Sequence, residues 1–519
     1  MYKSFIRHKV FGENEYAYEV VHYYDARKKR VRQRVKYLGK VTERGIERIR
    51  GLIVEKPRCA LDWGDVYVIE QILVELKLKE ILNQIFRKEK NLLLSLAINR
   101  VIGGVSLSNF QSWYDSTYLK VLYPIKDGLS SQSLSRSLER LGREDRKVLE
   151  FFLSWWEERK ETERTLFYDI TSLSSYSNSI NLLEYGYNRD NERLPQINVG
   201  LVAVSESNLP LYYKIFPGSI PDVKTLKNLT TEIKILGKGK PLLILDKGFY
   251  SIGNLEELKQ QGWKFIMPLP FSRKIARSLI RKERKNLDSP KNLKKYQDGF
   301  IQVMKGQIQI GKEKFYYYLY HDLERETREK IKFYKKLSEI EEMLEERQIK
   351  KGDNPKQLFK DIARTFSVYL SYTVKENYFQ IKRKERIIGD LLTRLGKEIL
   401  LSSQDLPWDL PISLYRGKEK IEKMFRTIKN ELSGLPLRVH KEETLKGYLF
   451  VTFLSLIIYF SLLNRMRETK LLKKISMENL FLELRKLRWV EFKKTGYLTE
   501  ISKTQTEIFQ QLGILMPKN

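Results

Sequence analysis

Three carboxylates stand where the sequence could bring them to one metal site. Asp169 follows the apolar run LFY and Asp246 follows LLIL, so each lies at or just beyond the end of an expected buried strand. A buried charge there is costly unless a partner or a metal ion compensates it. A strand-end aspartate also fits a cap for the next turn or helix. Two of them in one sheet favour a shared site, because ligands collect where strands diverge.

The third carboxylate, Glu422, lies in the segment 415–432, YRGKEKIEKMFRTIKNEL. Apolar residues recur in this segment at the spacing of a helix: Ile421, Met424, Phe425, Ile428 and Leu432. Polar residues at spacings of three, four and seven would share a narrow sector beside that stripe: Tyr415, Lys418, Glu422 and Lys429. The alternative explanation is a ladder of i,i+4 charges on a solvated face.

The sequence contains few histidine or cysteine side chains that could hold a metal ion. There is one cysteine, Cys59, and the four histidines are scattered. A zinc site of cysteine and histidine is therefore not expected. Carboxylates are hard oxygen ligands, which favour magnesium or manganese. A lone cysteine permits no intramolecular disulfide and fits a reducing cytoplasm.

The charge of the chain points to a polyanionic partner. Its 519 residues include 96 Lys and Arg against 65 Asp and Glu, a formal net charge of +31. Such an excess draws a protein toward phosphate backbones, so nucleic acid is the first partner to expect. An anionic membrane surface and an ordinary basic soluble protein are the alternatives. The length predicts two to four domains, and the first residues contain no apolar signal core.

One apolar run resembles a membrane span. Residues 448–463, YLFVTFLSLIIYFSLL, are nearly all apolar, but they are fewer than the roughly 20 residues that a bilayer requires. No second run of this kind accompanies it. We therefore expect a fully buried helix here, and no membrane partner.

The central part of the sequence predicts an α/β domain. Strand-like segments alternate with helical ones, as expected for a mixed sheet: 164–170, 196–204, 211–216, 241–246 and 264–269. After Pro270 a densely basic stretch, further strands and a long charged helix interrupt the pattern, which resumes near 386–403. This predicts a β-rich insertion domain over 271–385.

The N-terminal part carries two candidate DNA-binding elements. Segments 15–24 and 31–38 alternate like strands and predict a hairpin whose basic face is either solvated or in contact with DNA. Residues 62–160 are helical in pattern. Within them, 130–141 would expose Gln132, Arg136 and Arg140, as in either a recognition helix or any amphipathic helix.

These patterns divide the chain into six expected segments. They are an N-terminal hairpin region (1–58), a helical DNA-binding domain (59–160), two parts of a catalytic core (161–270 and 386–465), the insertion (271–385) and a helical C-terminal tail (466–519).

Several motifs resemble one known family. Tyr415, Lys418, Glu422 and Lys429 are similar to the YREK signature of the large group of insertion-sequence transposases with a DDE catalytic domain. DKGFYS around Asp246 resembles that group's D-x-G-[FY] motif, and YDITSLSSYS around Asp169 resembles its D-x-T block. The resemblance covers about 165–265 and 386–465.

The resemblance implies an RNase H-like catalytic domain with an insertion between the second aspartate and the glutamate. It implies that Asp169, Asp246 and Glu422 hold two Mg²⁺ ions, which Mn²⁺ can replace, with Asp169 bridging both. Tyr415, Lys418 and Lys429 would hold the backbone of the transposon end. Lys418 stands where the signature has arginine, so Arg416 or Arg426 could supply the bidentate phosphate contact that lysine cannot make.

The expected function is that of a DNA transposase, which binds insertion-sequence ends, cleaves them and joins the 3′ ends to target DNA. Because two ends must be paired, we expect a homodimer on DNA, in the nucleoid-associated cytoplasm of a prokaryote. An RNase H-like nuclease without strand transfer and a non-catalytic, transposase-derived regulator are the alternatives. A serine recombinase using Ser172 or Ser174 is disfavoured, because both serines fit turn or cap roles.

Overall fold

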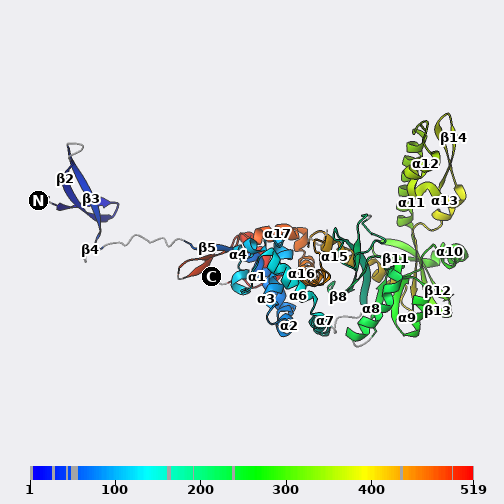
Figure 1. Cartoon of the computed structure of the whole chain (residues 1–519), viewed down its shortest axis with the longest axis horizontal. Coiled ribbons are helices and arrows are strands. Elements are labelled where there is room, and N and C mark those ends of the chain that lie inside the picture. Colours follow the sequence, from blue (N-terminus) through cyan, green and yellow to red (C-terminus); the bar gives the residue numbers. More distant parts are fainter. Residues whose placement is uncertain are drawn as a thin grey trace. The chain divides into compact units, whose positions relative to one another are not determined.

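The structure is a computed structural model that describes residues 4–25, 30–42, 45–47, 57–159, 165–190, 192–236, 240–432, 437–493 and 495–517. It has two compact units, Met1–Ala60 with Trp489–Leu498, and Leu61–Arg488 with Thr499–Asn519. Figure 1 shows the elements of each unit, which are described in turn.

The first unit is built on a four-stranded antiparallel sheet. Its strands follow chain order: β1 (Ser4–Phe11), β2 (Asn14–Asp25), β3 (Arg30–Thr42) and β4 (Gly45–Glu47). The pairing of β2 with β3 confirms the predicted hairpin, although residues 26–29 of its turn lie outside the described residues. Arg34 and Lys36 are exposed, and so are Val31 and Val35 of the other face. The first part of β3, residues 30–37, is thus mostly exposed on both faces.

A small three-stranded sheet combines one strand from the N-terminal part of the chain with two from the C-terminal part. It contains β5 (Cys59–Asp62), β17 (Arg488–Glu491) and β18 (Gly496–Leu498), in the order β18-β17-β5.

The second unit begins with a helical region, as the periodicity of 62–160 predicts. Its helices are α1 (Gly64–Glu75), α2 (Leu78–Ile85), α3 (Lys90–Ile98), the π-helical turn η1 (Asn99–Gly103), α4 (Phe110–Ser116), α5 (Leu119–Leu122), α6 (Ser131–Gly142) and α7 (Asp145–Arg159). Helix α6 starts at a serine cap, since the Ser130 side chain accepts from the Ser133 N–H. It buries Leu134 and Leu138 and exposes Arg136 and Arg140.

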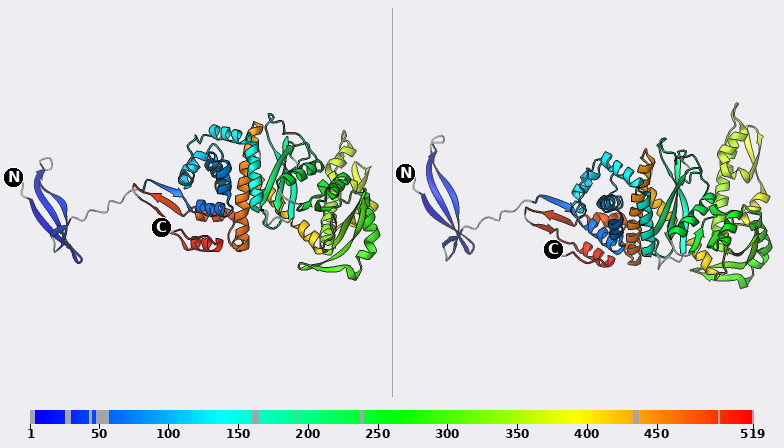
Figure 2. Two further views of the ribbon diagram at one scale, coloured as in Figure 1. Left: turned by 90° about the horizontal axis from the view of Figure 1, so that it is seen from below. Right: turned by 60° about the horizontal axis from the view of Figure 1, so that its bottom comes forward.

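Helix α16 (Glu442–Glu468) forms the core of this region. It is the one helix in the described part of the chain that is long and apolar enough to cross a membrane, and 83% of its apolar window is buried inside the protein. It contacts α1, α3 and α6 as well as β8 and α15. Figure 2 shows it between the helical region and the sheet. Its burial fits the interpretation of 448–463 as a core helix.

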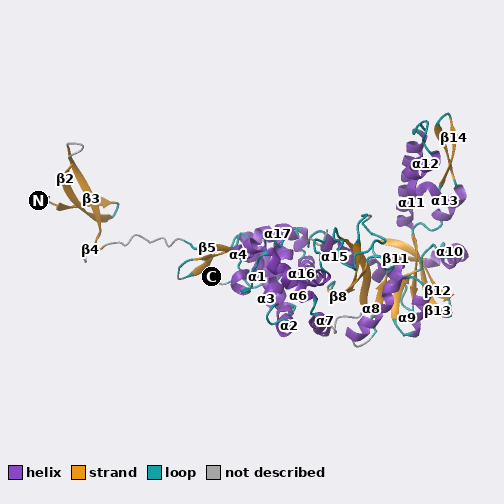
Figure 3. Ribbon diagram, viewed as in Figure 1, coloured by secondary structure: helices purple, strands orange, loops and turns teal. Residues whose placement is uncertain are grey.

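The C-terminal helices belong to the same helical region. Besides η5 (Leu471–Lys473), they are α17 (Met477–Leu484) and α18 (Lys503–Leu512). Arg485, which follows α17, pairs with buried Asp65 of α1 at 2.9 Å. The Phe509 ring of α18 lies 6.0 Å from the Tyr67 ring of α1. These contacts give α17 and α18 a structural role that the sequence left open, and Figure 3 shows that helices predominate in this region.

A nine-stranded mixed sheet forms the rest of the second unit. Its strands are β6 (Thr165–Ser174), β7 (Gln196–Val204), β8 (Pro210–Pro217), β9 (Leu242–Leu245), β10 (Lys264–Pro268), β11 (Leu293–Tyr296), β12 (Gly299–Ile310), β13 (Glu313–Asp322) and β16 (Lys397–Ser402). Their order is β11-β12-β13-β16-β10-β9-β6-β7-β8. β9 is parallel to both β6 and β10, and the other pairs are antiparallel. The chain thus has the mixed α/β architecture that the sequence predicts.

Helices flank this sheet, and the periodicity indicated those over 222–236, 252–260 and 419–429 but not the others. They are α8 (Asp222–Leu236), the short 3₁₀ turn η2 (Lys247–Phe249), α9 (Ile252–Gln260), α10 (Lys274–Leu287), the 3₁₀ turn η3 (Pro290–Asn292), α14 (Asp409–Arg416) and α15 (Glu419–Lys429).

The expected insertion of 271–385 differs from what the structure shows. Its first strands, β11 to β13, extend the central sheet, because β13 pairs with β16 over six residues. A separate apolar core lies in the stretch 323–392, which we call the inserted unit. It contains α11 (Leu323–Glu345), α12 (Pro355–Ala363), η4 (Arg364–Val368), β14 (Leu370–Lys375), β15 (Tyr378–Arg383) and α13 (Glu385–Leu392). It is therefore mainly helical, with one hairpin. The alternation of polar and apolar residues predicts a strand but not the strand with which it pairs. The sequence therefore could not show that β11 to β13 belong to the central sheet.

The register of the central strands places the first aspartate. β6 is buried along all ten residues and continues to Ser174, so Asp169 lies inside it and not at its end as expected. The last parallel pair joins Tyr168 to Leu245, where β9 stops. Asp169 and Asp246 are thus the next residues on adjacent strands, at the point where β9 leaves the sheet.

The contact between α6 and α16 yields a test of the fold. A side chain at Gly447 would overlap the carbonyl oxygen of Leu138, whereas one at Gly253 of α9 meets nothing within 4 Å. We expect Gly447→Val to lower the free energy of unfolding by about 1–3 kcal/mol through overpacking. Gly253→Ala should leave that free energy unchanged or raise it by up to about 1 kcal/mol. Denaturant unfolding followed by circular dichroism measures both, and equal stabilities would contradict the close α6–α16 contact.

Candidate active site

The glutamate helix is broken where the sequence predicted one continuous helix. α14 ends at Arg416 and α15 begins at Glu419, so Gly417 and Lys418 form the junction. Glycine suits this junction, because a Cβ on residue 417 would lie 3.2 Å from the Phe167 ring of β6, closer than most such contacts. The apolar stripe of α15 is buried as predicted. The break makes Lys418 the N-cap residue of α15 and leaves its side chain beside β6 and β9.

The Lys418 ammonium lies among the three candidate carboxylates. Its Nζ is 3.3 Å from Asp169 Oδ2, 3.1 Å from Asp246 Oδ1 and 3.7 Å from Glu422 Oε1. Lys418 and Asp169 are buried, whereas the Glu422 side chain is 56% exposed. The structure thus brings together the three acids that the sequence selects, around a cation that belongs to the chain.

Tyr415 completes this group from the end of α14. Its hydroxyl donates to Asp246 Oδ1 at 3.2 Å, the same oxygen that Lys418 approaches. Burial raises the pKa of Tyr415, and the negative charge of Asp246 raises it further. Tyr415 therefore stays a neutral hydrogen-bond donor.

Burial and charge set different proton affinities for the two aspartates. Burial raises the pKa of Asp169 to about 6, and Asp246 adds to the rise while Lys418 opposes it. At Asp246 burial acts in the same direction, but the Lys418 charge and three hydrogen bonds outweigh it, so its pKa is lowered. Burial alone would lower the pKa of Lys418, yet the charges of Asp169 and Asp246 raise it. Lys418 therefore remains a cation.

These groups open into a cleft of about 570 Å³. Further charged side chains line it in pairs. Arg189 donates to both carboxylate oxygens of Asp222 at 2.7 Å, and Lys429 donates to Asp190 at 2.5 Å. Lys247 and Arg426 line the same cleft. It therefore combines acids at its base with basic groups that suit a phosphate backbone.

Asp190, Arg189 and Asp222 were missed by sequence reasoning. Arg189 and Asp190 lie between β6 and β7, in a segment without periodicity. Asp222 begins α8, a place where an acid usually only favours the helix terminus. Gly248, the glycine of DKGFY, was the one sequence feature that pointed to a close neighbour at this place. A Cβ on Gly248 would lie 2.8 Å from Asp222 Oδ2, so this glycine leaves room for the Asp222 carboxylate.

The remaining candidate DNA contacts separate into two places. Lys429 and Arg426 lie in the cleft, as described. Arg416 does not line it, because its guanidinium donates to Asp322 at 2.8 Å and lies over the Tyr296 ring. Of the two arginines proposed to replace the signature arginine, only Arg426 is brought to the acids.

The carboxylate oxygens of these acids are suitable ligands for a divalent cation, but the three side chains lie too far apart to hold one as they stand. Within the ranges that the structure describes, no three Asp, Glu, His or Cys side chains are grouped closely enough to hold an ion. The place between the three carboxylates is filled by the Lys418 ammonium. Hard carboxylate oxygens that already surround one positive charge form a donor set suited to Mg²⁺ or Mn²⁺. A cation would have to displace Lys418 and recruit the exposed Glu422.

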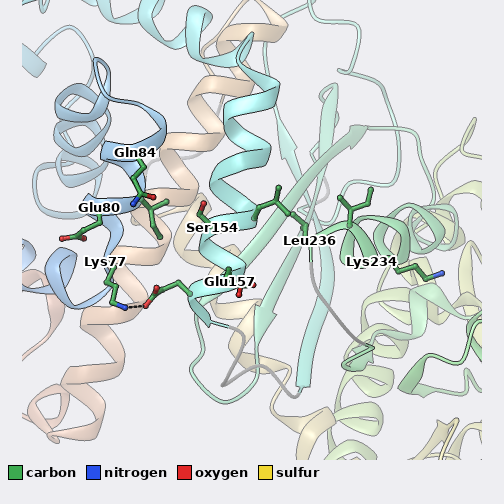
Figure 4. A pocket seen from close by; sticks show the side chains of 11 residues that line it. Lys77, Glu80, Gln84, Ser154, Glu157, Lys234 and Leu236 are labelled. Carbon is green, nitrogen blue, oxygen red and sulfur yellow. Dashed lines mark ion pairs between the residues drawn. The ribbon is translucent and has the colours of Figure 1, made fainter.

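A second cavity, of about 650 Å³, lies between α2, α7 and α8. Its acids do not converge. Glu158 pairs with Lys77 at 2.8 Å, and Figure 4 shows Glu80 and Glu157 on separate helices. This cavity therefore offers no comparable catalytic arrangement.

The two serines considered as nucleophiles lie within β6 and not in a turn or cap. Ser172 and Ser174 are fully buried, and Ser172 Oγ donates to Asn198 Oδ1 at 3.1 Å. A buried, hydrogen-bonded hydroxyl is poorly placed to attack a DNA phosphate.

Two solved transposase structures show low similarity to this chain. The piggyBac transposase synaptic complex with hairpin DNA has a TM-score of 0.36 and 11% identity, covering 76% of this chain and 69% of that one. The Mos1 transposase paired-end complex with left transposon end has a TM-score of 0.16 and 13% identity, covering 31% and 58%. No curated protein matches the chain.

A family model gives the decisive comparison. The model described as the transposase DDE domain matches residues 161–458, more than half of the chain. The matched range includes Asp169, Asp246, Tyr415, Lys418 and Glu422. The chain belongs to the family of transposases with a DDE domain.

Proposed function

We propose that this transposase cleaves the ends of an insertion sequence and joins their 3′ ends to target DNA, with Asp169, Asp246 and Glu422 as its catalytic acids. The observation that carries the proposal is the convergence of these acids on one cation position in a cleft with basic walls. We place the chain in the insertion-sequence group with the YREK signature, with Lys418 in the position of its arginine.

The topology supports an RNase H-like catalytic core. β6, β7 and β8 are consecutive and antiparallel, and β9 and β10 add in parallel on the other side of β6. Asp169 thus lies on the middle strand of these five, β6, and Asp246 lies at the end of its parallel neighbour, β9. α15 then supplies Glu422 from a helix that contacts β6.

Each residue of the cleft has a role in this proposal. The three acids would hold Mg²⁺, or Mn²⁺ in its place. Two bound metal ions activate the attacking hydroxyl and stabilise the leaving oxygen of a phosphoryl transfer. Tyr415, Lys418, Arg426 and Lys429 would contact the DNA backbone and position it without reading sequence.

The proposed function predicts the behaviour of neutral acid variants. Asp169→Asn, Asp246→Asn and Glu422→Gln should each lower Mg²⁺-dependent end cleavage on the order of a thousandfold or more, with end binding retained. Double variants should be no worse than single ones, because the acids act as a unit. Labelled-end cleavage and gel-shift assays on the purified chain measure both properties.

The control for these variants is Glu419→Gln, which removes an exposed acid from the first turn of the same helix. It should cleave like the wild type. Undiminished cleavage by any of the three acid variants would contradict the site. Pre-cleaved ends supplied with a target plasmid distinguish a transposase from a nuclease without strand transfer, since only the former yields joined DNA.

The position of Lys418 predicts an unusual effect on metal binding. Removing its charge in Lys418→Gln should strengthen Mn²⁺ binding by about tenfold or more. A unit charge about 4 Å away opposes a cation by roughly 4 kcal/mol in a partly buried site, and displacing the side chain recovers part of this cost. Lys420→Gln is the matched control, because Lys420 lies on the same helix and donates to the Ser205 carbonyl. Equal Mn²⁺ affinities for both variants, measured by calorimetry, would contradict competition between the Lys418 ammonium and the metal ion for one position.

The raised pKa of Asp169 predicts how metal binding depends on pH. Protonated Asp169 cannot serve as a carboxylate ligand, so Mn²⁺ affinity should fall about tenfold per pH unit below pH 6, where its pKa lies. Asp246 has a lowered pKa and stays ionised there, so one proton should compete and not two. In the absence of metal, the contribution of Asp169 to folding stability changes with pH in the opposite direction to the metal affinity. The favourable contribution of Asp169 is complete below its ordinary pKa and is lost as pH rises through about 6. A constant Mn²⁺ affinity between pH 5 and pH 7 would contradict this assignment.

A further inference from the structure

Helix α10 carries a basic face that the catalytic cleft does not use. Residues 273–296 contain ten Lys or Arg and two acids. Within α10 the basic residues Lys274, Arg277, Arg281 and Lys285 are exposed and recur at spacings of three and four. They therefore form one stripe along the helix. The one acid within α10, Glu283, is buried and leaves this stripe without an opposing charge of its own.

Among the described residues, the surroundings offer the stripe one ion pair. It joins Arg281, which is 73% exposed, to Asp390 of α13 at 3.6 Å. The other side of α10 is apolar and buries Ala276, Leu279, Ile280 and Leu287. Helix α10 contacts β12, and Figure 1 shows it at the outside of the sheet. The sheet thus fixes the helix and turns the basic stripe toward solvent.

The stripe begins beside the catalytic motif. β10 is parallel to β9, with Ile266 next to Ile244, so both strands end at the same edge of the sheet as Asp246. The chain enters α10 directly from that edge. Arg273, the residue before the helix, lies over the ring of Tyr250, which belongs to the DKGFYS motif, at 5.4 Å from its centre. The basic face is therefore an extension of the active-site edge.

The basic surface continues beyond the helix. Lys291 and Lys294 line a hollow of about 410 Å³ together with Asn286, Asn292 and Lys305, whose ammonium pairs with Asp405. Helix α10 alone has 14 residues, a rise of roughly 20 Å, which corresponds to about six base-pair steps of duplex DNA. Its length and charge fit a DNA backbone.

We propose that the α10 stripe binds duplex target DNA and leads it to the catalytic cleft. This inference rests on the proposed function of the cleft. Lysine and arginine contacts to phosphates hold a duplex without specifying its sequence. Target DNA requires such contacts, because its sequence varies from one insertion to the next. The ends of the element must instead be recognised by sequence, so a stripe of basic side chains is better suited to the target.

The test compares two matched triple variants of the full chain. Arg277, Arg281 and Lys285 are replaced by Gln in the first. The control replaces Arg328, Lys332 and Lys335 of α11 by Gln. These residues are also exposed and share one helical face, but α11 carries acids on either side of them, three at 324–329 and four at 339–345. Both variants lose the same charge, so a general electrostatic effect would appear in both.

Binding to a random-sequence duplex without element ends is measured by fluorescence anisotropy over a range of salt concentrations. The α10 variant should bind about tenfold or more weakly near physiological salt. The slope of log affinity against log salt should become shallower by about 2 to 3, from the loss of two or three phosphate contacts. The α11 variant should match the wild type. Equal affinities and slopes for all three proteins would overturn the proposal.

Strand joining and end cleavage then identify which DNA the stripe holds. With pre-cleaved ends and a target plasmid, the α10 variant should form about tenfold less joined product while cleaving uncut ends at the wild-type rate. Loss of end binding and cleavage instead would assign the stripe to the transposon end and overturn the target assignment. If the wild type itself neither cleaves nor joins, the proposed function of the cleft fails, while the duplex-binding result still reports on α10.

Discussion

One lysine ammonium among three carboxylates is the interaction on which the rest of the candidate active site depends. Without Lys418, the buried Asp169 and the half-buried Asp246 would face each other as like charges, at a considerable cost. Lys418 stands at the junction of α14 and α15, where the neighbouring Gly417 lies against the Phe167 ring. The strand register, the helix junction and the charge balance of the cleft are therefore parts of one arrangement.

The same arrangement explains why a transposase of this family can fold with so many acids at one edge of a sheet. Asp222 is held by Arg189, Asp190 by Lys429, and the three candidate catalytic acids by Lys418. Each carboxylate of the cleft thus has a cation supplied by the chain. The basic side chains that neutralise these acids are also suited to bind phosphate groups. If a metal ion takes their place beside the acids, they can pair with phosphates, and no buried charge is left unpaired.

Local patterns predicted a large part of this architecture. The strand 196–204, the helices on either side of Asp246 and the buried run 448–463 were all evident from periodicity and composition. Asp169, Asp246 and Glu422 were selected by position and by motif resemblance, and they converge in the structure.

The features that the sequence could not predict depend on long-range pairing. The addition of β11–β13 to the central sheet and the partnership of Asp222 with Arg189 join segments whose spacing carries no periodic signal. The break at Gly417 was foreseeable in principle, since glycine weakens a helix interior, but the strong apolar stripe concealed it.

The connections of the inserted unit have a consequence for how such a chain can evolve. β13 and β16 are antiparallel neighbours, and the Asp322 N–H donates to the Gly396 carbonyl at 2.8 Å, where the chain leaves the sheet and returns to it. The entire stretch 323–392, with its own apolar core, is therefore the loop of a β-hairpin. Loop-closure entropy grows only slowly with length, so a hairpin tolerates a loop of almost any size once its two strands are paired. A lineage could exchange this module, shorten it or reduce it to a tight turn while β13 and β16 keep their register in the catalytic sheet.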